Sequence, residues 1–188
     1  MGKLTIYGNL GSTCTKRVLL TLAEKNVTDF EFKSVDFSKG EHKSPEYIEK
    51  HQPFGQVPVL YDDDLKIFES RAIARYIADT VEGGQQLFPK DAKTRALIEQ
   101  WISVESSHGK SVETIVAELV FKKWYGSAAD PKVVEENSKK LHAFLAAFDK
   151  QLIGKSYLVG NDFTLAGKIS VLLNLLIEIF RFNIYSLP

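Results

Sequence analysis

The residues best suited to chemistry lie in two neighbouring segments, 52–60 (QPFGQVPVL) and 68–77 (FESRAIARYI). The first predicts a strand that starts near a proline, where Val57 offers a main-chain N–H and C=O before Pro58. The second predicts a helix that begins at Glu69 and Ser70, and a helix N-terminus binds carboxylates through its exposed N–H groups. Together the two segments predict a site that binds a small peptide through main-chain groups. Glu69 and Ser70 also suit a simple helix cap, and the two interpretations are compatible.

A second hydroxyl stands near the N-terminus, where Ser12 and Thr13 precede an apolar helical pattern. A hydroxyl at this place can donate a hydrogen bond to an anion, and the positive end of the helix favours the same negative charge. The spacing leaves two alternatives open: Ser12 only caps the helix, or Thr13 supplies the hydroxyl instead.

The pattern around these residues predicts the elements that position them. Two alternating segments, 4–7 and 30–35, flank the helical stretch that ends near Lys25, which predicts a βαβ unit with a parallel strand pair. Further on, the sequence predicts a hairpin whose turn consists of three aspartates at 62–64. We interpret this turn as solvated rather than as a metal site, because aspartate is a common turn residue.

After residues 81–89, which contain paired glycines and a proline, the pattern becomes helical. Apolar residues follow helical spacing over 92–119, and Asp130 with Pro131 starts another helix. The apolar stripe of that helix is expected to be buried and consists of Leu141, Phe144, Leu145, Phe148 and Leu152.

These motifs resemble the glutathione-binding half of glutathione transferases and are most similar to the plant phi class. The resemblance covers about residues 3–166. It implies an α/β, thioredoxin-like N-terminal domain (1–81), a linker (82–91) and an all-α C-terminal domain (92–188).

By this resemblance Ser12 is the catalytic residue. Its hydroxyl and the adjoining helix N-terminus would lower the pKa of the glutathione thiol, because the thiolate is the nucleophile. The resemblance also implies a cis bond before Pro58. The glutathione-binding residues that it implies are His42, Lys43, Gln56, Val57, Pro58, Glu69 and Ser70. Taken alone, His42 and Lys43 would indicate only a basic surface loop.

The implied reaction conjugates reduced glutathione to hydrophobic electrophiles, with peroxide reduction as a related activity, and needs no metal or redox cofactor. Candidates for the apolar electrophile site are Leu10, Phe37 and Leu119. Family members are usually homodimers. Two alternatives remain: a non-catalytic binding or carrier protein, and a reductase that depends on Cys14. We expect Cys14 to point away from the site of Ser12.

The composition narrows the classes of partner and compartment. The formal net charge is +0, which argues against a nucleic-acid binder that works by charge. A single cysteine excludes an internal disulfide framework and suits a reducing compartment. The sequence shows no signal-peptide pattern, and the apolar run 169–177 is shorter than the roughly 20 residues that a membrane span needs. We therefore expect a cytoplasmic protein without membrane or nucleic-acid partners.

The C-terminal part departs from the family pattern. The family reads Phe-Thr-Leu-Ala-Asp where this chain has Gly167 in the last position, so Thr164 would cap the following helix alone. We expect the C-terminus to be atypical and shortened after about residue 166, and the activity to be impaired. A polar stripe over 168–182 predicts a further helix and consists of Ser170, Asn174, Glu178 and Arg181.

Overall fold

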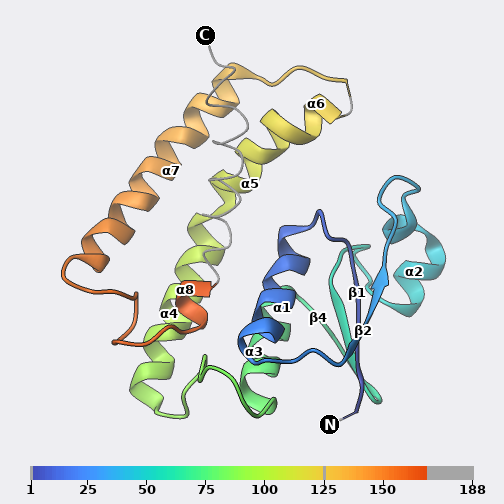
Figure 1. Ribbon diagram of the computed structural model, residues 1–188. Helices are drawn as coiled ribbons and strands as arrows, with labels where there is room; N and C mark the ends of the chain where they lie inside the picture. The colour runs from blue at the N-terminus through green and yellow to red at the C-terminus, as the bar shows by residue number, and fades with distance from the viewer. Residues whose placement is uncertain (1, 125, 169–188) are drawn as a thin grey trace. The chain divides into compact units, whose positions relative to one another are not determined.

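The computed structural model describes residues 2–124 and 126–168. The chain divides into two compact units, Met1–Lys90 and Asp91–Pro188, which are considered separately. The first unit mixes strands and helices, whereas the second is helical in the part that the structure describes (Figure 1).

A four-stranded sheet in the order β2-β1-β3-β4 forms the centre of the first unit. Strand β1 (Leu4–Gly8) pairs in parallel with β2 (Phe30–Ser34), which confirms the predicted βαβ unit. Strand β3 (Val59–Asp62) runs antiparallel to β1 and forms the predicted hairpin with β4 (Leu65–Phe68).

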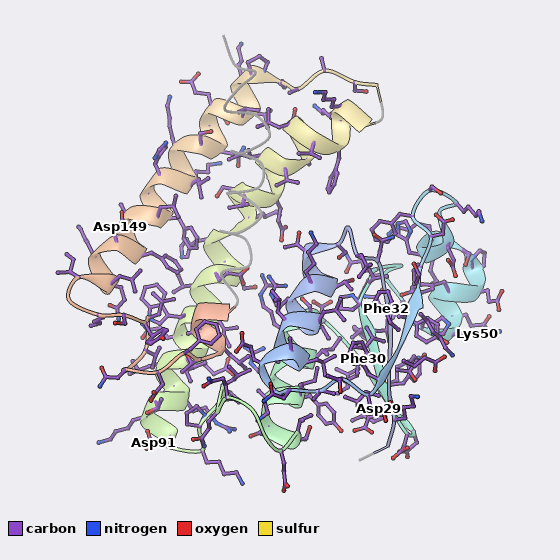
Figure 2. The ribbon with its side chains drawn as sticks, in the orientation of Figure 1. Asp29, Phe30, Phe32, Lys50, Asp91 and Asp149 are labelled. Atoms are coloured by element: carbon purple, nitrogen blue, oxygen red, sulfur yellow. The ribbon has the colours of Figure 1, made fainter. Side chains whose placement is uncertain are left out.

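Two helices cover one face of this sheet. Helix α1 (Thr13–Glu24) lies beside α3 (Ser70–Thr80) (Figure 1). Phe30 and Phe32 of β2 pack against the same core (Figure 2). The buried members of this core are Leu4, Ile6, Val18, Leu22, Leu60, Ile73, Ile77 and Val81. Removing these side chains from water is the main driving force for assembling the unit.

The short helices α2 (Pro45–Lys50) and η1 (Glu41–Lys43) follow β2. A second, smaller core links α2 to the sheet through Val35, Tyr47 and Val59. Only Asp63 and Asp64 form the exposed turn, which corrects the prediction of a turn of three solvated aspartates, because Asp62 is the buried last residue of β3. The Asp62 carboxylate accepts hydrogen bonds from the Tyr76 hydroxyl at 2.7 Å and from the Gly2 N–H at 3.1 Å. Among the described residues, no group of three or more His, Cys, Asp or Glu side chains could hold a metal ion.

Part of the segment predicted as a linker, 82–91, is fastened to the first unit. The Gln85 N–H donates to the Glu24 carbonyl at 2.9 Å, and Lys25 Nζ donates to the Gln85 carbonyl at 3.3 Å. Leu87 and Phe88 are buried. These contacts explain why the first compact unit extends to Lys90 rather than ending at residue 81.

The second unit contains α4 (Ala92–His108), α5 (Lys110–Val116), α6 (Lys122–Trp124), α7 (Pro131–Leu152) and α8 (Leu165–Lys168). Asp91 caps α4 by accepting the Thr94 N–H at 2.8 Å, and this bond holds the pKa of the Asp91 carboxyl below its ordinary value. A π-helical stretch, Ala117–Phe121, connects α5 to α6. The predicted helical region 92–119 is therefore interrupted, because Gly109 ends α4 and a π turn follows α5.

The predicted start of α7 is confirmed, with Asp130 as cap and Pro131 in the first turn. Of its predicted apolar stripe, only Leu141 and Phe148 are buried, whereas Phe144, Leu145 and Leu152 are partly exposed. Leu141 packs with α5, and the Phe148 ring lies 4.9 Å from that of Trp101. Thr164, just before α8, has a buried hydroxyl without a hydrogen-bond partner among the described residues, so its side chain does not cap α8 as the sequence predicts. The Gly167 N–H donates to the Thr164 carbonyl instead. The predicted polar stripe of Ser170, Asn174, Glu178 and Arg181 lies outside the described residues. Within the described part of the chain, every helix is too short or too polar to cross a membrane.

Candidate functional site

A cavity of about 280 Å³ opens in the first unit, and segments far apart in the sequence line it. Its lining includes every residue predicted to be catalytic or to bind glutathione: Ser12, His42, Lys43, Gln56, Val57, Pro58, Glu69 and Ser70. The remaining lining residues are Cys14, Phe37, Gln52, Gly55 and Arg71. Two helix N-termini, those of α1 and α3, therefore contribute to one cavity.

Ser12 is the N-cap of α1, with extended backbone at φ −82° and ψ 124°. Its Oγ accepts a hydrogen bond from the Thr15 N–H at 3.3 Å. A hydroxyl that accepts this bond keeps its own proton for donation. Capping the helix and donating to an anion in the cavity are therefore compatible roles for Ser12.

Cys14 lines the same cavity as Ser12, which corrects the expectation that it points away from the serine's site. Ser12 is the cap of α1, and Cys14 lies in the first turn of the same helix. This turn brings Cys14 to the cavity wall beside Ser12. The Cys14 sulfur lies 3.7 Å from Nη1 of Arg17, a side chain only 2% exposed.

Arg17 also connects the two helix starts. Its Nη1 donates to the Ser70 Oγ at 2.6 Å, and Ser70 is buried at the first position of α3. Sequence reasoning missed Arg17. The available signal was a cationic side chain on the apolar face of α1, between Val18 and the start of the helix. A buried cation needs an electrostatic partner, so it marks a place where negative charge is favoured.

Glu69 precedes α3 with a main-chain φ of +72° and ψ of 105°. Such angles cost a non-glycine residue about 1–3 kcal/mol and persist only where the surroundings enforce them. Here the Glu69 carbonyl accepts the Ile73 N–H at 2.9 Å as part of the helix start. The strained residue lines the cavity, which fits a functional constraint on the direction of its side chain.

The segment from Gln52 to Pro58 forms one wall of the cavity and contains the cis Val57–Pro58 bond that the resemblance implies. Gly55 has φ +61°, and a Cβ atom there would lie 2.6 Å from the His42 carbonyl oxygen. Only glycine fits this close approach without rearrangement. The Lys43 ammonium donates to the Phe54 carbonyl at 3.1 Å, so this cation also fastens the segment.

His42 lies in η1, and its ring centroid is 4.5 Å from that of Phe37. Burial, and then the charge of Lys43, hold the pKa of His42 below its ordinary value of 6.5. The ring is therefore mainly neutral at pH 7. Its Nδ1 is buried and has no hydrogen-bond partner in the part of the chain that the structure describes.

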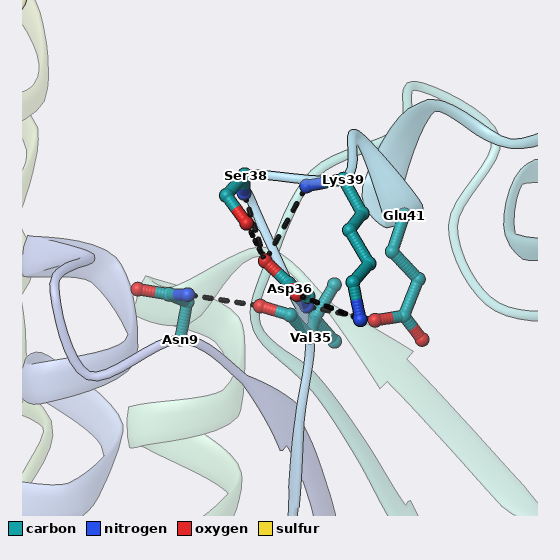
Figure 3. Close-up of polar contacts among 6 residues, drawn as sticks. All are labelled: Asn9, Val35, Asp36, Ser38, Lys39 and Glu41. Carbon is teal, nitrogen blue, oxygen red and sulfur yellow. Dashed lines mark hydrogen bonds and ion pairs between the residues drawn. The ribbon is translucent and has the colours of Figure 1, made fainter.

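A polar network holds the loop between β2 and η1 (Figure 3). Phe37 belongs to this loop, and His42 follows it in η1. Asp36 accepts from the Ser38 hydroxyl at 2.6 Å, which is the main reason that the pKa of Asp36 is lowered. The Asp36 N–H donates to the Glu41 carboxylate at 2.7 Å, and Asn9 donates to the Val35 carbonyl at 2.8 Å. These bonds hold the end of β2, the Asp36 turn and the start of η1 together.

The candidates for the electrophile site do not gather in this cavity. Phe37 lines it, whereas Leu10 is 62% exposed and is not among the lining residues. Leu119 belongs to the second unit, where it packs against a buried cluster that includes Val112 and Leu141.

Family models match both parts of the chain. The model of the glutathione S-transferase N-terminal domain matches residues 2–79, and that of the C-terminal domain matches residues 111–185. The second match continues well past residue 166, where sequence inspection placed the end of the resemblance.

Individual proteins give the same assignment. Glutathione S-transferase F10 of Arabidopsis thaliana is 43% identical over 165 residues, which is 87% of this chain and 75% of the relative. The crystal structure of glutathione transferase F2 from Populus trichocarpa superposes with a TM-score of 0.84 and 37% identity, covering 90% of this chain and 79% of the other. Glutathione S-transferase I from maize in complex with an atrazine glutathione conjugate gives a TM-score of 0.82 and 31% identity, over 95% and 83% of the two chains. The chain described here belongs to the glutathione S-transferase family.

Proposed function

We propose that this protein binds reduced glutathione in the cavity of its first unit and transfers it to hydrophobic electrophiles. The observation that carries this proposal is the meeting, in one cavity, of a hydroxyl at the start of α1, the main chain of Val57 and the Glu69–Ser70 start of α3. These are the groups needed to hold a peptide with charged ends and to stabilise a thiolate between them.

Each part of glutathione finds complementary groups in this assignment. The γ-glutamyl end meets Gln56, Glu69 and Ser70, where the Glu69 carboxylate suits the ligand's ammonium group. Ser70 accepts from Arg17 and so keeps its own proton for the ligand's carboxylate. The main chain of Val57 pairs with the cysteinyl unit as an added strand would. At the other end, Lys43 and His42 supply donors for the glycine carboxylate.

The chemical step follows from the position of Ser12. Its hydroxyl donates a hydrogen bond to the glutathione sulfur, and the α1 N-terminus favours the negative charge, so more of the thiol ionises. The thiolate then attacks an electrophilic carbon, a carbon–sulfur bond forms and the leaving group departs with its electron pair. Reduction of peroxides by the same thiolate is a second activity of the same site.

Assembly and location complete the proposal. The protein forms a homodimer, for which α3 and α4 supply the helices that the family uses. It acts in the cytoplasm, where reduced glutathione is present and where its single cysteine stays a free thiol.

Calorimetric titration with reduced glutathione, together with turnover of an activated aryl halide, tests this function. Glu69→Gln should weaken glutathione binding, because it removes the charge that faces the ligand's ammonium group. Glu82→Gln, which changes an exposed carboxylate of the same unit, serves as the matched control and should bind normally. No binding by folded wild-type protein would overturn the proposal. Binding without turnover would instead indicate a carrier protein with the same fold.

A further inference from the structure

We infer that Tyr47 and Gln52 are positioning residues of the glutathione site: they fix the Gln56 peptide groups from both sides and so preset the main chain of Val57. This inference rests on the proposed function. Neither side chain is assigned to the chemical step. Both act through the segment that forms one wall of the cavity.

Gln52 holds this segment from within. The residue is only 2% exposed, and its Oε1 accepts the Phe54 N–H at 2.7 Å and the Gln56 N–H at 3.1 Å. Its main-chain carbonyl accepts the Gly55 N–H at 2.9 Å. A single residue therefore orients three N–H groups of the four residues that follow it.

Tyr47 holds the segment from α2. Its side chain is 3% exposed and belongs to the small core with Val35 and Val59, so the ring has a fixed position. The hydroxyl donates to the Gln56 carbonyl at 3.0 Å. Burial, as the largest cause, raises the pKa of Tyr47 to about 12, so the hydroxyl remains a donor across the working pH range of an enzyme.

These two contacts determine which main-chain groups of the segment remain for a ligand. The N–H and the C=O of Gln56 are both engaged by protein side chains, so the main-chain groups that face a ligand at this wall come from Val57, just before the cis Pro58. Holding a main chain in its bound conformation before the ligand arrives removes an ordering cost from binding. Losing one such restraint should therefore weaken glutathione binding without changing the reaction of the bound thiol.

Tyr47→Phe removes only the hydroxyl that contacts Gln56. Because a neutral hydrogen bond of this kind changes an equilibrium about 3- to 10-fold, the Kd and KM for glutathione should rise about 3- to 10-fold while kcat stays unchanged. Gln52→Met keeps the length of the side chain but removes the oxygen that accepts both N–H groups, so the Kd should rise at least as much.

Tyr61→Phe provides a matched control in the same aromatic cluster. The Tyr61 hydroxyl contacts His51 Nδ1 at 2.9 Å and donates to the Lys50 carbonyl at 3.2 Å, away from Gln56. This variant loses a comparable hydroxyl, so its melting temperature should fall as in Tyr47→Phe while its affinity for glutathione stays at the wild-type value.

The experiment compares the wild type and the three variants by calorimetric titration with reduced glutathione, steady-state turnover and thermal unfolding. Absence of binding by the wild type would refute the proposed function itself. Normal binding by the wild type and an unchanged Kd in Tyr47→Phe would overturn the positioning role and leave the function intact. An equal rise of Kd in Tyr61→Phe would also overturn it, because general destabilisation would then explain both variants.

Discussion

Replacement of Ser12 separates its two possible roles, because capping and thiolate stabilisation need different properties of the side chain. Ser12→Ala removes the cap and the donor together. Ser12→Gly removes the donor but keeps most of the capping stability, and Ser12→Asp keeps a strong cap but cannot donate. If Ser12 acts on the thiol, all three variants lose turnover, whereas only the alanine variant clearly loses stability.

The expected magnitudes follow from the contacts of Ser12. Its bond to the Thr15 N–H is 3.3 Å long, which is long for a hydrogen bond, so Ser12→Ala should cost about 1 kcal/mol of unfolding free energy. A hydrogen bond to a charged acceptor contributes about 1.5–3 kcal/mol, and one pKa unit corresponds to about 1.4 kcal/mol. Loss of the hydroxyl should therefore raise the pKa of the bound thiol by about one to two units and reduce turnover near neutral pH about 10- to 100-fold.

Three measurements check these values. The ultraviolet absorbance of the thiolate, followed against pH at saturating glutathione, gives the thiol pKa in each variant. Turnover of an aryl halide at the same saturation gives kcat, and urea unfolding gives the stability. Wild-type turnover in Ser12→Asp would refute the catalytic role, because it would show that the cap alone matters. Loss of turnover in proportion to stability across the series would refute it equally.

Three further changes test the fold and the site. Gly55→Ala should cost about 2 kcal/mol or more and weaken glutathione binding, because the new Cβ meets the His42 carbonyl at positive φ; normal melting and affinity would contradict this. A hydrogen bond from the Asp130 N–H holds the pKa of the Glu118 carboxyl in the folded protein below its ordinary value of 4.5. The ionised carboxylate therefore adds stability above pH 4.5, and this contribution is lost as the pH falls through the lowered pKa of the folded state. In urea unfolding at acidic pH, the unfolding free energy of Glu118→Gln should therefore fall less steeply with decreasing pH than that of the wild type. The same pH dependence in both proteins would contradict this role of Glu118. Gly167→Asp should have an unfolding free energy about 1 kcal/mol higher than Gly167→Ala, because both variants place a Cβ 3.2 Å from the Phe163 ring and only the first adds a carboxylate; equal stability of the two variants in urea would refute the capping argument.

Local patterns were enough to predict the sheet elements and the helix starts. The alternation in β1 and β2, the hairpin of β3 and β4 and the cap of α7 all depend on residues within a few positions of one another. The π turn after α5 was not predicted, because apolar spacing is nearly the same for the two kinds of helix over so short a stretch. The anchoring of residues 82–91 also escaped prediction, since its partners Glu24 and Lys25 lie far away in the sequence.

For the site, the sequence by itself determined which residues could do the chemistry, because the resemblance placed Ser12 and Glu69 on recognisable helix starts. Only the tertiary structure decided how they are supported. Arg17 reaches Ser70 across 53 residues, and Tyr47 reaches the carbonyl of Gln56 from a different element. Such contacts depend on the packing of α1 against α3 and of α2 against the sheet. A helix cap is set by the residues beside it, whereas a buried hydrogen bond between elements exists only once the hydrophobic core has fixed their distance and orientation.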